Sequence, residues 1–119
     1  IKGGSALRSS NYEDYSVVFM ELDGSVLGVV ETNWLTPYKL RKLYVTGDRA
    51  VAELDYIQQT LVIHNKEFTI DVKIEKSEPL KNELKHFIEC VREGKKPSID
   101  GKEAAQLLRI IEEALKAEH

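Results

Sequence analysis

The alternation of apolar and polar residues divides the chain into a strand-rich part and a helical part. Between Tyr15 and Ile74, apolar residues come in short runs that alternate with polar residues, a pattern typical of β-strands. Beyond Ser77 they return every three to four residues, as they do in amphipathic helices. The pattern therefore predicts a set of strands followed by helices.

Six runs have the length and composition of strands, and turn residues separate them. The clearest hairpin joins two β-rich runs across Asp23-Gly24, because Asp-Gly is a strong signal for a tight turn. A second hairpin is predicted across Asn65-Lys66. The predicted strands are residues 15–22, 26–34, 40–46, 50–56, 59–65 and 67–75.

Two helices complete the pattern. The first is predicted to begin near Pro79, a residue favoured in the first helical turn, and to end at Gly94. The second follows Asp100, which can cap its N-terminus, with Glu103 three residues later. Their apolar stripes are Leu80, Leu84, Phe87, Ile88 and Val91 in the first helix, and Ala104, Leu108, Ile111 and Leu115 in the second. We therefore predict an α+β fold, an open and mainly antiparallel six-stranded sheet with the two C-terminal helices packed on one face.

The first predicted strand is apolar on both sides. Its two sides carry Tyr15, Val17 and Phe19, and Val18, Met20 and Leu22. Because two helices cover only one face of a sheet, we expect the open face to bind a second copy of the chain, in a dimer or tetramer, or a further domain. The alternative is a strand at the edge of a curled sheet, where Tyr15 and Phe19 fold over their own core.

The length of 119 residues fits a single domain. We expect residues 1–13 to be an irregular lead-in, because they contain glycines and serines without periodicity, and residues 14–119 to form the domain. The chain opens on Ile1 and not on Met, so we expect it to be part of a longer protein.

Charge and composition narrow the class of partner. The formal net charge is −3, with basic and acidic residues interspersed, so we expect no nucleic acid partner. No apolar run approaches the ~18 residues of a membrane span, so we expect no membrane partner. The single cysteine, Cys90, excludes an internal disulfide and suggests a reducing, cytoplasmic location.

Known catalytic and cofactor motifs are missing from this chain. Its glycines never form the G-x-G-x-x-G pattern of a dinucleotide site, so it is not expected to hold NAD alone. His86 and Cys90 share a helix face, but zinc sites need a third or fourth ligand, so no metal site is expected. Glu53 and Asp55 have the spacing of an acid–base pair, although a solvated sheet face explains them more simply.

The segment after the second strand carries one tryptophan and several cations. Trp34 offers a flat apolar surface with one N–H donor, and Lys39, Arg41 and Lys42 follow a Thr-Pro turn. Cations beside an indole suit an anionic sugar or a nucleotide diphosphate. The alternative is a wide strand connection in which the tryptophan caps the core and the cations are solvated, and the residues alone favour neither.

Two motifs resemble a known family. Residues 34–47 read Trp-x-x-Pro-x-Lys-x-Arg-x-Leu-x-Val-x-Gly, and residues 83–97 combine Glu-x-x-x-Phe-x-x-x-Val with a closing Gly-Lys-x-Pro. They are similar to the C-terminal domain of the glucose-fructose oxidoreductase, inositol dehydrogenase and MocA (Gfo/Idh/MocA) family, from about Asp14 to Leu115. Within it, the chain looks most similar to bacterial and archaeal enzymes of the UDP-N-acetylglucosamine 3-dehydrogenase type.

The resemblance implies part of an NAD(P)-dependent sugar or nucleotide-sugar dehydrogenase, in which hydride passes between a ring carbon and the nicotinamide. An N-terminal Rossmann domain of the same chain would hold NAD or NADP, while this domain would bind substrate and pair subunits. The residues matching positions near the substrate are Trp34, Lys39 and Arg41.

The family's catalytic residues are not matched here. Glu75-Lys76-Ser77 departs from the family's Glu-Lys-Pro motif in its third residue, and the family's catalytic histidine and aspartate lie upstream of the matched region. No catalytic residue is therefore expected in this chain, which should be inactive by itself.

Two other functions stay open. The chain could be a free-standing, non-catalytic dimerisation module. It could also be a small ligand-binding fold, which would need an enclosed cavity, and the sequence shows no polar cluster to line one.

Overall fold

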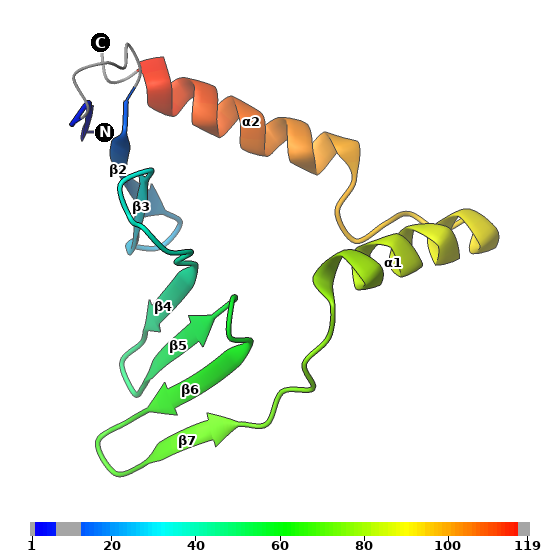
Figure 1. Ribbon diagram of the computed structural model, residues 1–119, viewed down its shortest axis with the longest axis horizontal. Coiled ribbons are helices and arrows are strands. Elements are labelled where there is room, and N and C mark those ends of the chain that lie inside the picture. The colour runs from blue at the N-terminus through cyan, green and yellow to red at the C-terminus, as the bar shows by residue number, and fades with distance from the viewer. Residues whose placement is uncertain (1, 7–12, 117–119) are drawn as a thin grey trace. The chain divides into compact units, whose positions relative to one another are not determined.

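The computed structural model describes residues 2–6 and 13–116 (Figure 1). Its strands are β1 (Lys2–Gly4), β2 (Tyr15–Leu22), β3 (Val26–Asn33), β4 (Lys42–Thr46), β5 (Val51–Asp55), β6 (Thr60–His64) and β7 (Thr69–Val72). Its helices are α1 (Pro79–Glu93) and α2 (Gly101–Lys116). The chain forms two compact units, the first made of Ile1–Pro37 with Gly94–His119 and the second of Tyr38–Glu93.

The first unit contains a three-stranded antiparallel sheet in the order β1-β2-β3. The predicted hairpin is confirmed: β2 and β3 pair along their whole length, from Tyr15 opposite Asn33 to Leu22 opposite Val26. The connecting turn needs left-handed backbone, with φ of 74° at Gly24 and 72° at Ser25. Glycine adopts that conformation without steric cost, which is why Asp-Gly marks the turn.

Strand β1 lies in the segment expected to be irregular. Its three residues pair with the start of β2, and Gly4 faces Tyr15. A Cβ atom on Gly4 would lie 2.5 Å from the Tyr15 hydroxyl and 2.9 Å from its ring carbon Cζ, so the tyrosine ring packs over the bare glycine backbone. Residues 7–12 of the expected lead-in lie outside the described residues.

The second unit contains a four-stranded antiparallel sheet in the order β4-β5-β6-β7. Strand register separates its two faces. The polar face carries Lys42, Tyr44, Thr46, Val51, Glu53, Asp55, Thr60, Val62, His64, Thr69 and Asp71. The apolar face carries Leu43, Val45, Ala52, Leu54, Leu61, Ile63, Ile70 and Val72.

The prediction of one six-stranded sheet is wrong. The described strands form two antiparallel sheets, of three and four strands, and β3 does not pair with β4. After β3 the chain makes a turn in which the Asn33 side chain accepts backbone hydrogen bonds. Residues 34–41 also include Pro37, which has no N–H to donate to a strand ladder. The α+β class stands.

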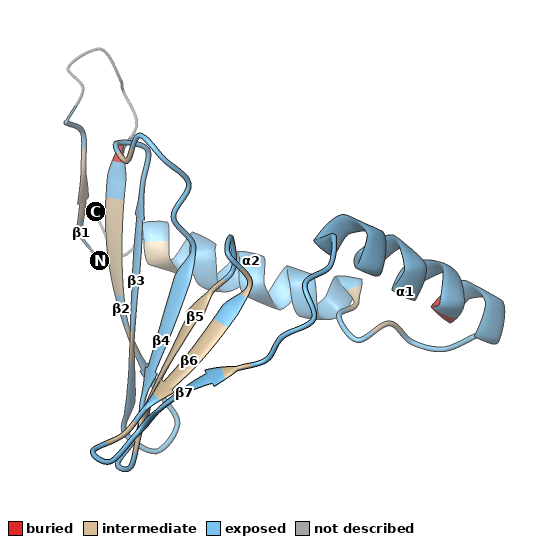
Figure 2. Ribbon diagram, turned by 60° about the horizontal axis from the view of Figure 1, so that its bottom comes forward, coloured by how far each residue is buried: buried red, intermediate tan, exposed pale blue. Residues whose placement is uncertain are grey.

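Each face of the β2–β3 hairpin carries several apolar residues, as the first predicted strand suggested. One, here called the Phe19 face, carries Tyr15, Val17, Phe19, Leu27 and Val29 together with Glu21, Glu31 and Asn33; the other carries Val18, Met20, Leu22, Val26 and Val30 together with Ser16 and Thr32. Figure 2 shows that half-buried residues concentrate in β2, β5 and β6, the inner strands of their sheets. The side chain of Phe19 is 69% exposed, so the Phe19 face holds a large uncovered apolar surface.

The first helix begins and ends close to the predicted positions, and the second begins directly after Asp100, as predicted. The Glu78 carboxylate caps α1 by accepting the N–H groups of Leu80 at 3.2 Å and Lys81 at 2.6 Å, and Gly94 ends it with a φ of 64°. The Asp100 carboxylate caps α2, accepting from Lys102 and Glu103 at 2.9 Å each. All residues of the predicted apolar stripes are exposed, so packing of the helices on a sheet face stays a prediction. Neither described helix combines the length and hydropathy needed to cross a membrane.

A side-chain clamp joins the β5–β6 turn to the segment before α1. The Gln59 side chain donates to the Ser77 carbonyl at 2.8 Å and accepts from the Ser77 N–H at 2.9 Å. Gln59 has a φ of 52°, uncommon for a residue with a side chain. The carboxamide thus pairs with the backbone as a strand neighbour would.

Candidate functional site

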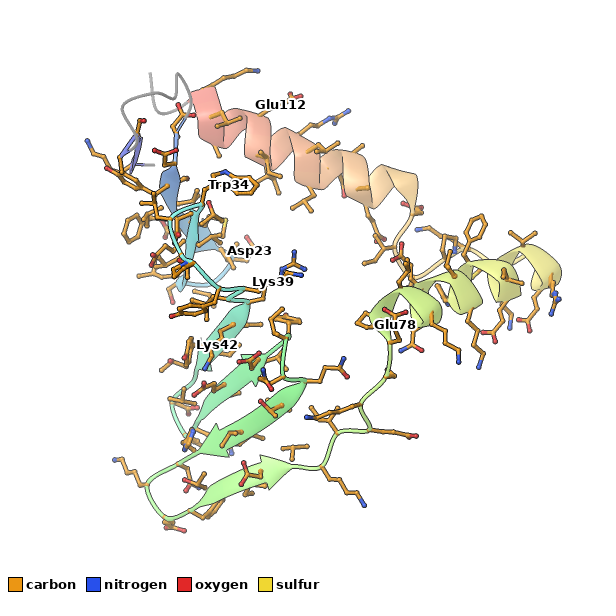
Figure 3. The ribbon with its side chains drawn as sticks, viewed as in Figure 1. Asp23, Trp34, Lys39, Lys42, Glu78 and Glu112 are labelled. Carbon is orange, nitrogen blue, oxygen red and sulfur yellow. The ribbon has the colours of Figure 1, made fainter. Side chains whose placement is uncertain are left out.

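Trp34 directly follows β3 in the first unit, and its backbone is firmly held. Its N–H donates to the carbonyl of Asp14 at 2.8 Å, which extends the β2–β3 ladder by one pair. Its side chain is nevertheless 87% exposed (Figure 3). The alternative in which this tryptophan caps the core of its own unit is therefore not what the structure shows. A large aromatic ring is instead presented outward from a fixed backbone.

The turn after Trp34 is closed by the side chain of Asn33. Its Oδ1 atom accepts from the N–H of Leu35 at 3.0 Å, the N–H of Thr36 at 2.9 Å and the Thr36 hydroxyl at 2.7 Å. Asparagine commonly closes turns in this way. Because Oδ1 serves the turn, the amide Nδ2 group of Asn33 is the end that can donate outward.

A cavity of about 270 Å³ lies at this end of the β2–β3 hairpin. It is lined by Glu13, Asp14, Tyr15, Ser16, Thr32, Asn33 and Trp34. Asp14 is only 6% exposed, and its carboxylate accepts from the Ala6 N–H at 2.9 Å and the Ser5 hydroxyl at 3.3 Å. The aspartate thus ties residues 5 and 6 to the start of β2 and gives the cavity a fixed wall.

Lys39 and Arg41 lie in the second unit, in the segment that leads into β4. Both side chains are exposed. The Arg41 carbonyl accepts from the N–H of Tyr56 at 3.0 Å, so Arg41 extends the β4–β5 ladder by one pair. Among the described residues, no ion pair involves Lys39 or Arg41. These two cations are therefore available to an anionic ligand.

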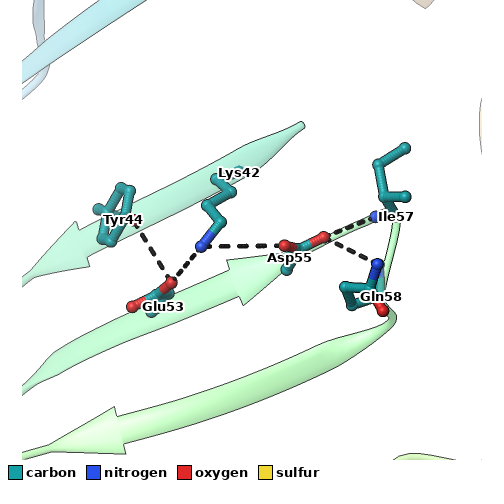
Figure 4. Close-up of polar contacts among 6 residues, drawn as sticks. All are labelled: Lys42, Tyr44, Glu53, Asp55, Ile57 and Gln58. Carbon is teal, nitrogen blue, oxygen red and sulfur yellow. Dashed lines mark hydrogen bonds and ion pairs between the residues drawn. The ribbon is translucent and has the colours of Figure 1, made fainter. Parts of the chain in front are cut away.

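Lys42, the third cation of the segment, is engaged on the polar face (Figure 4). Its Nζ atom lies 2.7 Å from Glu53 Oε1 and 3.8 Å from Asp55 Oδ2, and the Tyr44 hydroxyl donates to Glu53 at 3.4 Å. The hydrogen bond with Glu53 raises the pKa of Lys42, and the same bond lowers the pKa of Glu53. Lys42 is thus held in ion pairs, unlike Lys39 and Arg41 among the described residues.

The geometry argues against acid–base chemistry at Glu53 and Asp55. Both carboxylates pair with Lys42, and Asp55 Oδ1 also accepts from the N–H groups of Ile57 at 2.9 Å and Gln58 at 2.8 Å. A carboxylate that must take up a proton near neutral pH needs a raised pKa, whereas the pKa of Glu53 is lowered. Asp55 thus closes the turn after β5, and Glu53 forms a cross-strand ion pair with Lys42.

The His86 and Cys90 side chains do meet on α1, with the sulfur 3.6 Å from Nε2 and 3.9 Å from Nδ1. Cys90 is buried. Across residues 2–6 and 13–116, no group of three or more His, Cys, Asp or Glu side chains could hold a metal ion. A hollow of about 560 Å³ beside α1 is lined only by residues between Glu78 and Arg92, and one helix cannot enclose a ligand.

The predicted substrate residues are divided between the two units. Lys39 and Arg41 belong to the second unit and Trp34 to the first. The sequence missed the cavity residues of β2, because they lie far from Trp34 along the chain. Hairpin symmetry could have found them: Asp14 and Trp34 are equally distant from Gly24, so a turn centred on that glycine places them opposite each other.

Comparisons with known proteins agree with this fold. The family profile described as "Oxidoreductase family, C-terminal alpha/beta domain", named for the Gfo/Idh/MocA proteins, matches residues 3–119. Two solved structures of UDP-N-acetylglucosamine 3-dehydrogenase from Acidithiobacillus ferrooxidans are similar in fold, each at 18% identity. One has a TM-score of 0.82 over 91% of this chain, and the other 0.75 over 85%.

The chain spans about a third of those structures, 35% of one and 33% of the other. No curated protein matches it. The family match extends over almost the whole chain, including the exposed Trp34 and the segment of Lys39 and Arg41. The chain therefore belongs to the Gfo/Idh/MocA oxidoreductase family, as its C-terminal alpha/beta domain.

Proposed function

We propose that this chain is the substrate-binding and oligomerisation domain of an NAD(P)-dependent sugar or nucleotide-sugar dehydrogenase. The observation that carries the proposal is the family match over residues 3–119. The fold likeness to a dehydrogenase that is named for a UDP-sugar supports the substrate class. The match to one third of that enzyme supports a division of labour, with the remaining functions outside these residues.

The residues of this chain do not fit a dinucleotide. The sequence has no G-x-G-x-x-G loop between a strand and a helix, and β-strands with helical crossovers, on which such loops lie, are replaced by antiparallel hairpins in the described residues. We therefore assign NAD or NADP to an N-terminal Rossmann domain of the same protein, and no chemical step to residues of this chain.

For substrate binding we assign the phosphate groups to Lys39 and Arg41. Both are exposed, and neither takes part in an ion pair among the described residues, whereas Lys42 is neutralised by Glu53. A guanidinium can bind a phosphate with two parallel hydrogen bonds. We also assign Trp34 to substrate binding, through its exposed indole ring.

The test is the affinity for UDP-N-acetylglucosamine, measured by calorimetry. Loss of one charge-assisted hydrogen bond weakens binding by about 1.5–3 kcal/mol, so Arg41→Ala should raise the dissociation constant roughly 10- to 150-fold. Arg49→Ala removes the same charge from an exposed residue of the β4–β5 turn, next to Asp48, and should change little. Equal affinities of the two variants would remove Arg41 from the site. In the complete enzyme, an unchanged Michaelis constant for Arg41→Ala would do the same.

We further propose that the Phe19 face pairs subunits in a dimer or tetramer. Its support is the exposed apolar surface of Tyr15, Phe19, Leu27 and Val29, because monomeric proteins rarely leave such patches uncovered. The variant that tests this interface is developed in the Discussion.

A second candidate is a free-standing dimerisation module without chemistry. The missing dinucleotide loop and the exposed apolar residues on the β2–β3 hairpin favour it. The coding sequence upstream of Ile1 distinguishes the two functions. An open reading frame that continues upstream for a further domain of roughly 100–200 residues, with G-x-G-x-x-G after its first strand, supports the enzyme. A start codon immediately before Ile1 supports the module.

A further inference from the structure

The chain contains two Asp-Gly pairs, and the structure holds them in different ways. They are Asp23-Gly24, in the turn between β2 and β3, and Asp100-Gly101, at the start of α2. In an Asp-Gly pair the glycine nitrogen can attack the aspartate side chain, because no side chain on the glycine hinders its approach. Since the two pairs are identical, the structure around each decides its reactivity.

Nothing holds the Asp23 carboxylate among the described residues. Asp23 lies exposed at the closed end of the hairpin (Figure 3), and no ion pair of the described chain engages it. Beyond the Leu22–Val26 pair that ends the ladder, the turn makes no backbone–backbone hydrogen bond. Its one side-chain hydrogen bond in the described chain runs from the Ser25 hydroxyl to the Gly24 carbonyl. The Gly24 nitrogen is therefore open to the neighbouring carboxyl group.

The Asp100 carboxylate is fixed. Its Oδ1 atom accepts the N–H groups of Lys102 and Glu103 at 2.9 Å each, and its Oδ2 atom lies 2.9 Å from Lys96 Nζ. Before the carboxyl carbon can reach the Gly101 nitrogen, this cap and this ion pair must break. The Glu103 N–H and the Lys96 ammonium also lower the pKa of Asp100, and a carboxylate loses oxygen as water less readily than a protonated carboxyl group does.

The reaction at such a pair releases one water molecule and takes one up. In the first step, the glycine nitrogen forms a bond to Cγ of the aspartate, and the amide hydrogen leaves with the carboxyl hydroxyl group as water, which produces a cyclic succinimide. In the second step, water adds to one of the two ring carbonyl carbons and breaks its bond to the nitrogen. Breakage at Cγ restores aspartate, whereas breakage at the main-chain carbonyl gives isoaspartate, whose backbone runs through Cβ and Cγ. No oxidant or reductant takes part.

We propose that Asp23 is a site of spontaneous isoaspartate formation in the folded chain, and that the cap of α2 protects Asp100 from the same reaction. The site is independent of the proposed function, because it depends only on how the two Asp-Gly pairs are held. The turn of Asp23 presents the product to solvent. The partner that fits it is an enzyme of the class that methylates isoaspartyl carboxylates.

Isoaspartate would change the hairpin that Asp23 closes. Its backbone contains one more methylene carbon than that of aspartate, and the turn joins Leu22 directly to its partner Val26. Because the turn fixes the register of a hairpin, a longer turn should loosen the strand pairs next to it. The modified chain should therefore melt at a lower temperature than the unmodified chain.

The direct test is to age the folded chain at neutral pH and physiological temperature and to locate isoaspartate by peptide mass spectrometry. Electron-transfer fragmentation distinguishes the two isomers, and labelling by an isoaspartyl methyltransferase measures their amount. Isoaspartate should accumulate at Asp23. At Asp100 it should form roughly 5- to 30-fold more slowly, the factor that corresponds to a helix cap worth about 1–2 kcal/mol. In urea, which unfolds both sites, the two rates should be similar.

Two substitutions at position 23 test the site itself. Asp23→Glu keeps the charge but would have to close a larger ring, which forms far more slowly, so labelling should fall to the level of Asp100. Asp23→Ser, which retains a side chain common in turns, should do the same. Asp48→Glu is the matched control, because Asp48 is an exposed turn aspartate that precedes Arg49 and not a glycine; it should leave labelling unchanged. On ageing, the wild-type melting temperature should fall and that of Asp23→Glu should not.

Three results would overturn the site: equal rates at Asp23 and Asp100 in the folded chain, no isoaspartate at Asp23 after a time in which the chain in urea has reacted, or unchanged labelling of Asp23→Glu. An aged chain that carries isoaspartate at Asp23 and melts like the fresh chain would overturn the effect on the hairpin. The affinity of Arg41→Ala for UDP-N-acetylglucosamine tests the proposed function separately, so failure of one leaves the other standing.

Discussion

Replacing Phe19 by alanine provides the sharpest test of the proposed subunit interface. Full burial of a phenylalanine side chain contributes about 1.5–3 kcal/mol, and Phe19 is 69% exposed in the single chain. Covering it should thus contribute about 1–2 kcal/mol per subunit. A two-fold interface uses the residue twice, so Phe19→Ala should weaken a dimer by about 2–4 kcal/mol, or roughly 30- to 700-fold in dissociation constant.

Sedimentation velocity over a range of concentrations measures that constant. Ile99→Ala is the matched control, because Ile99 is 73% exposed and belongs to the linker between α1 and α2 in the sequence, not to a strand. Thermal unfolding of the dissociated Phe19→Ala chain should change little, since exposed side chains contribute little to monomer stability. Equal dissociation constants for the two variants, or a wild-type chain that stays monomeric at high micromolar concentration, would refute the interface.

Three further predictions concern stability. Gln59→Ala removes both hydrogen bonds to Ser77 and should lower the free energy of unfolding, measured in urea, by about 1–2 kcal/mol. Gln59→Gly should be about 1 kcal/mol more stable than Gln59→Ala, because the φ of 52° strains alanine. If Gln59→Ala were the more stable of the two, the clamp would be contradicted. Asp14→Ala leaves the Ala6 N–H without its carboxylate and should cost about 1–3 kcal/mol in the same assay, whereas a loss within error would mean that the cavity wall does not need it. The Glu103 N–H and the Lys96 ammonium lower the pKa of Asp100 below its ordinary 3.8. The carboxylate therefore stabilises the fold above that pH, and its contribution is lost as the pH falls through the lowered pKa. The melting temperature of Asp100→Asn should depend less on pH below about 4 than that of the wild-type chain, and parallel plots of melting temperature against pH for the two proteins would show that Asp100 makes no such contribution.

The elements that the sequence predicted best are those whose ends depend on adjacent residues. The Asp23-Gly24 turn, the Asn65 turn, the start of α1 at Pro79 and the cap of α2 at Asp100 are each set by a few neighbouring residues. Strand β1 escaped prediction because Lys2-Gly3-Gly4 shows no alternation; it becomes a strand only through its pairing with β2. The division into two sheets escaped for a related reason, since pairing between distant strands leaves no local signal.

The candidate site shows the same limit. Trp34, Lys39 and Arg41 stood out because of residue type and of their resemblance to a family motif. The contrast between Lys39 and Lys42 could not be predicted, because it depends on Glu53, which lies diagonally across from Lys42 on the neighbouring strand β5. Predicting the cavity residues of β2 would have required the exact register of the hairpin, because a shift of one residue moves every side chain to the opposite face of the sheet.

The order of the strands has a consequence for how this domain reaches its native state. In the sheet of β4 to β7, each strand pairs with its neighbour in sequence, and the same is true of β2 and β3. Closing such short loops costs little chain entropy, and topologies dominated by local pairing fold quickly. Each hairpin can thus assemble during synthesis as soon as its own two strands have emerged, before the helices that follow have been translated.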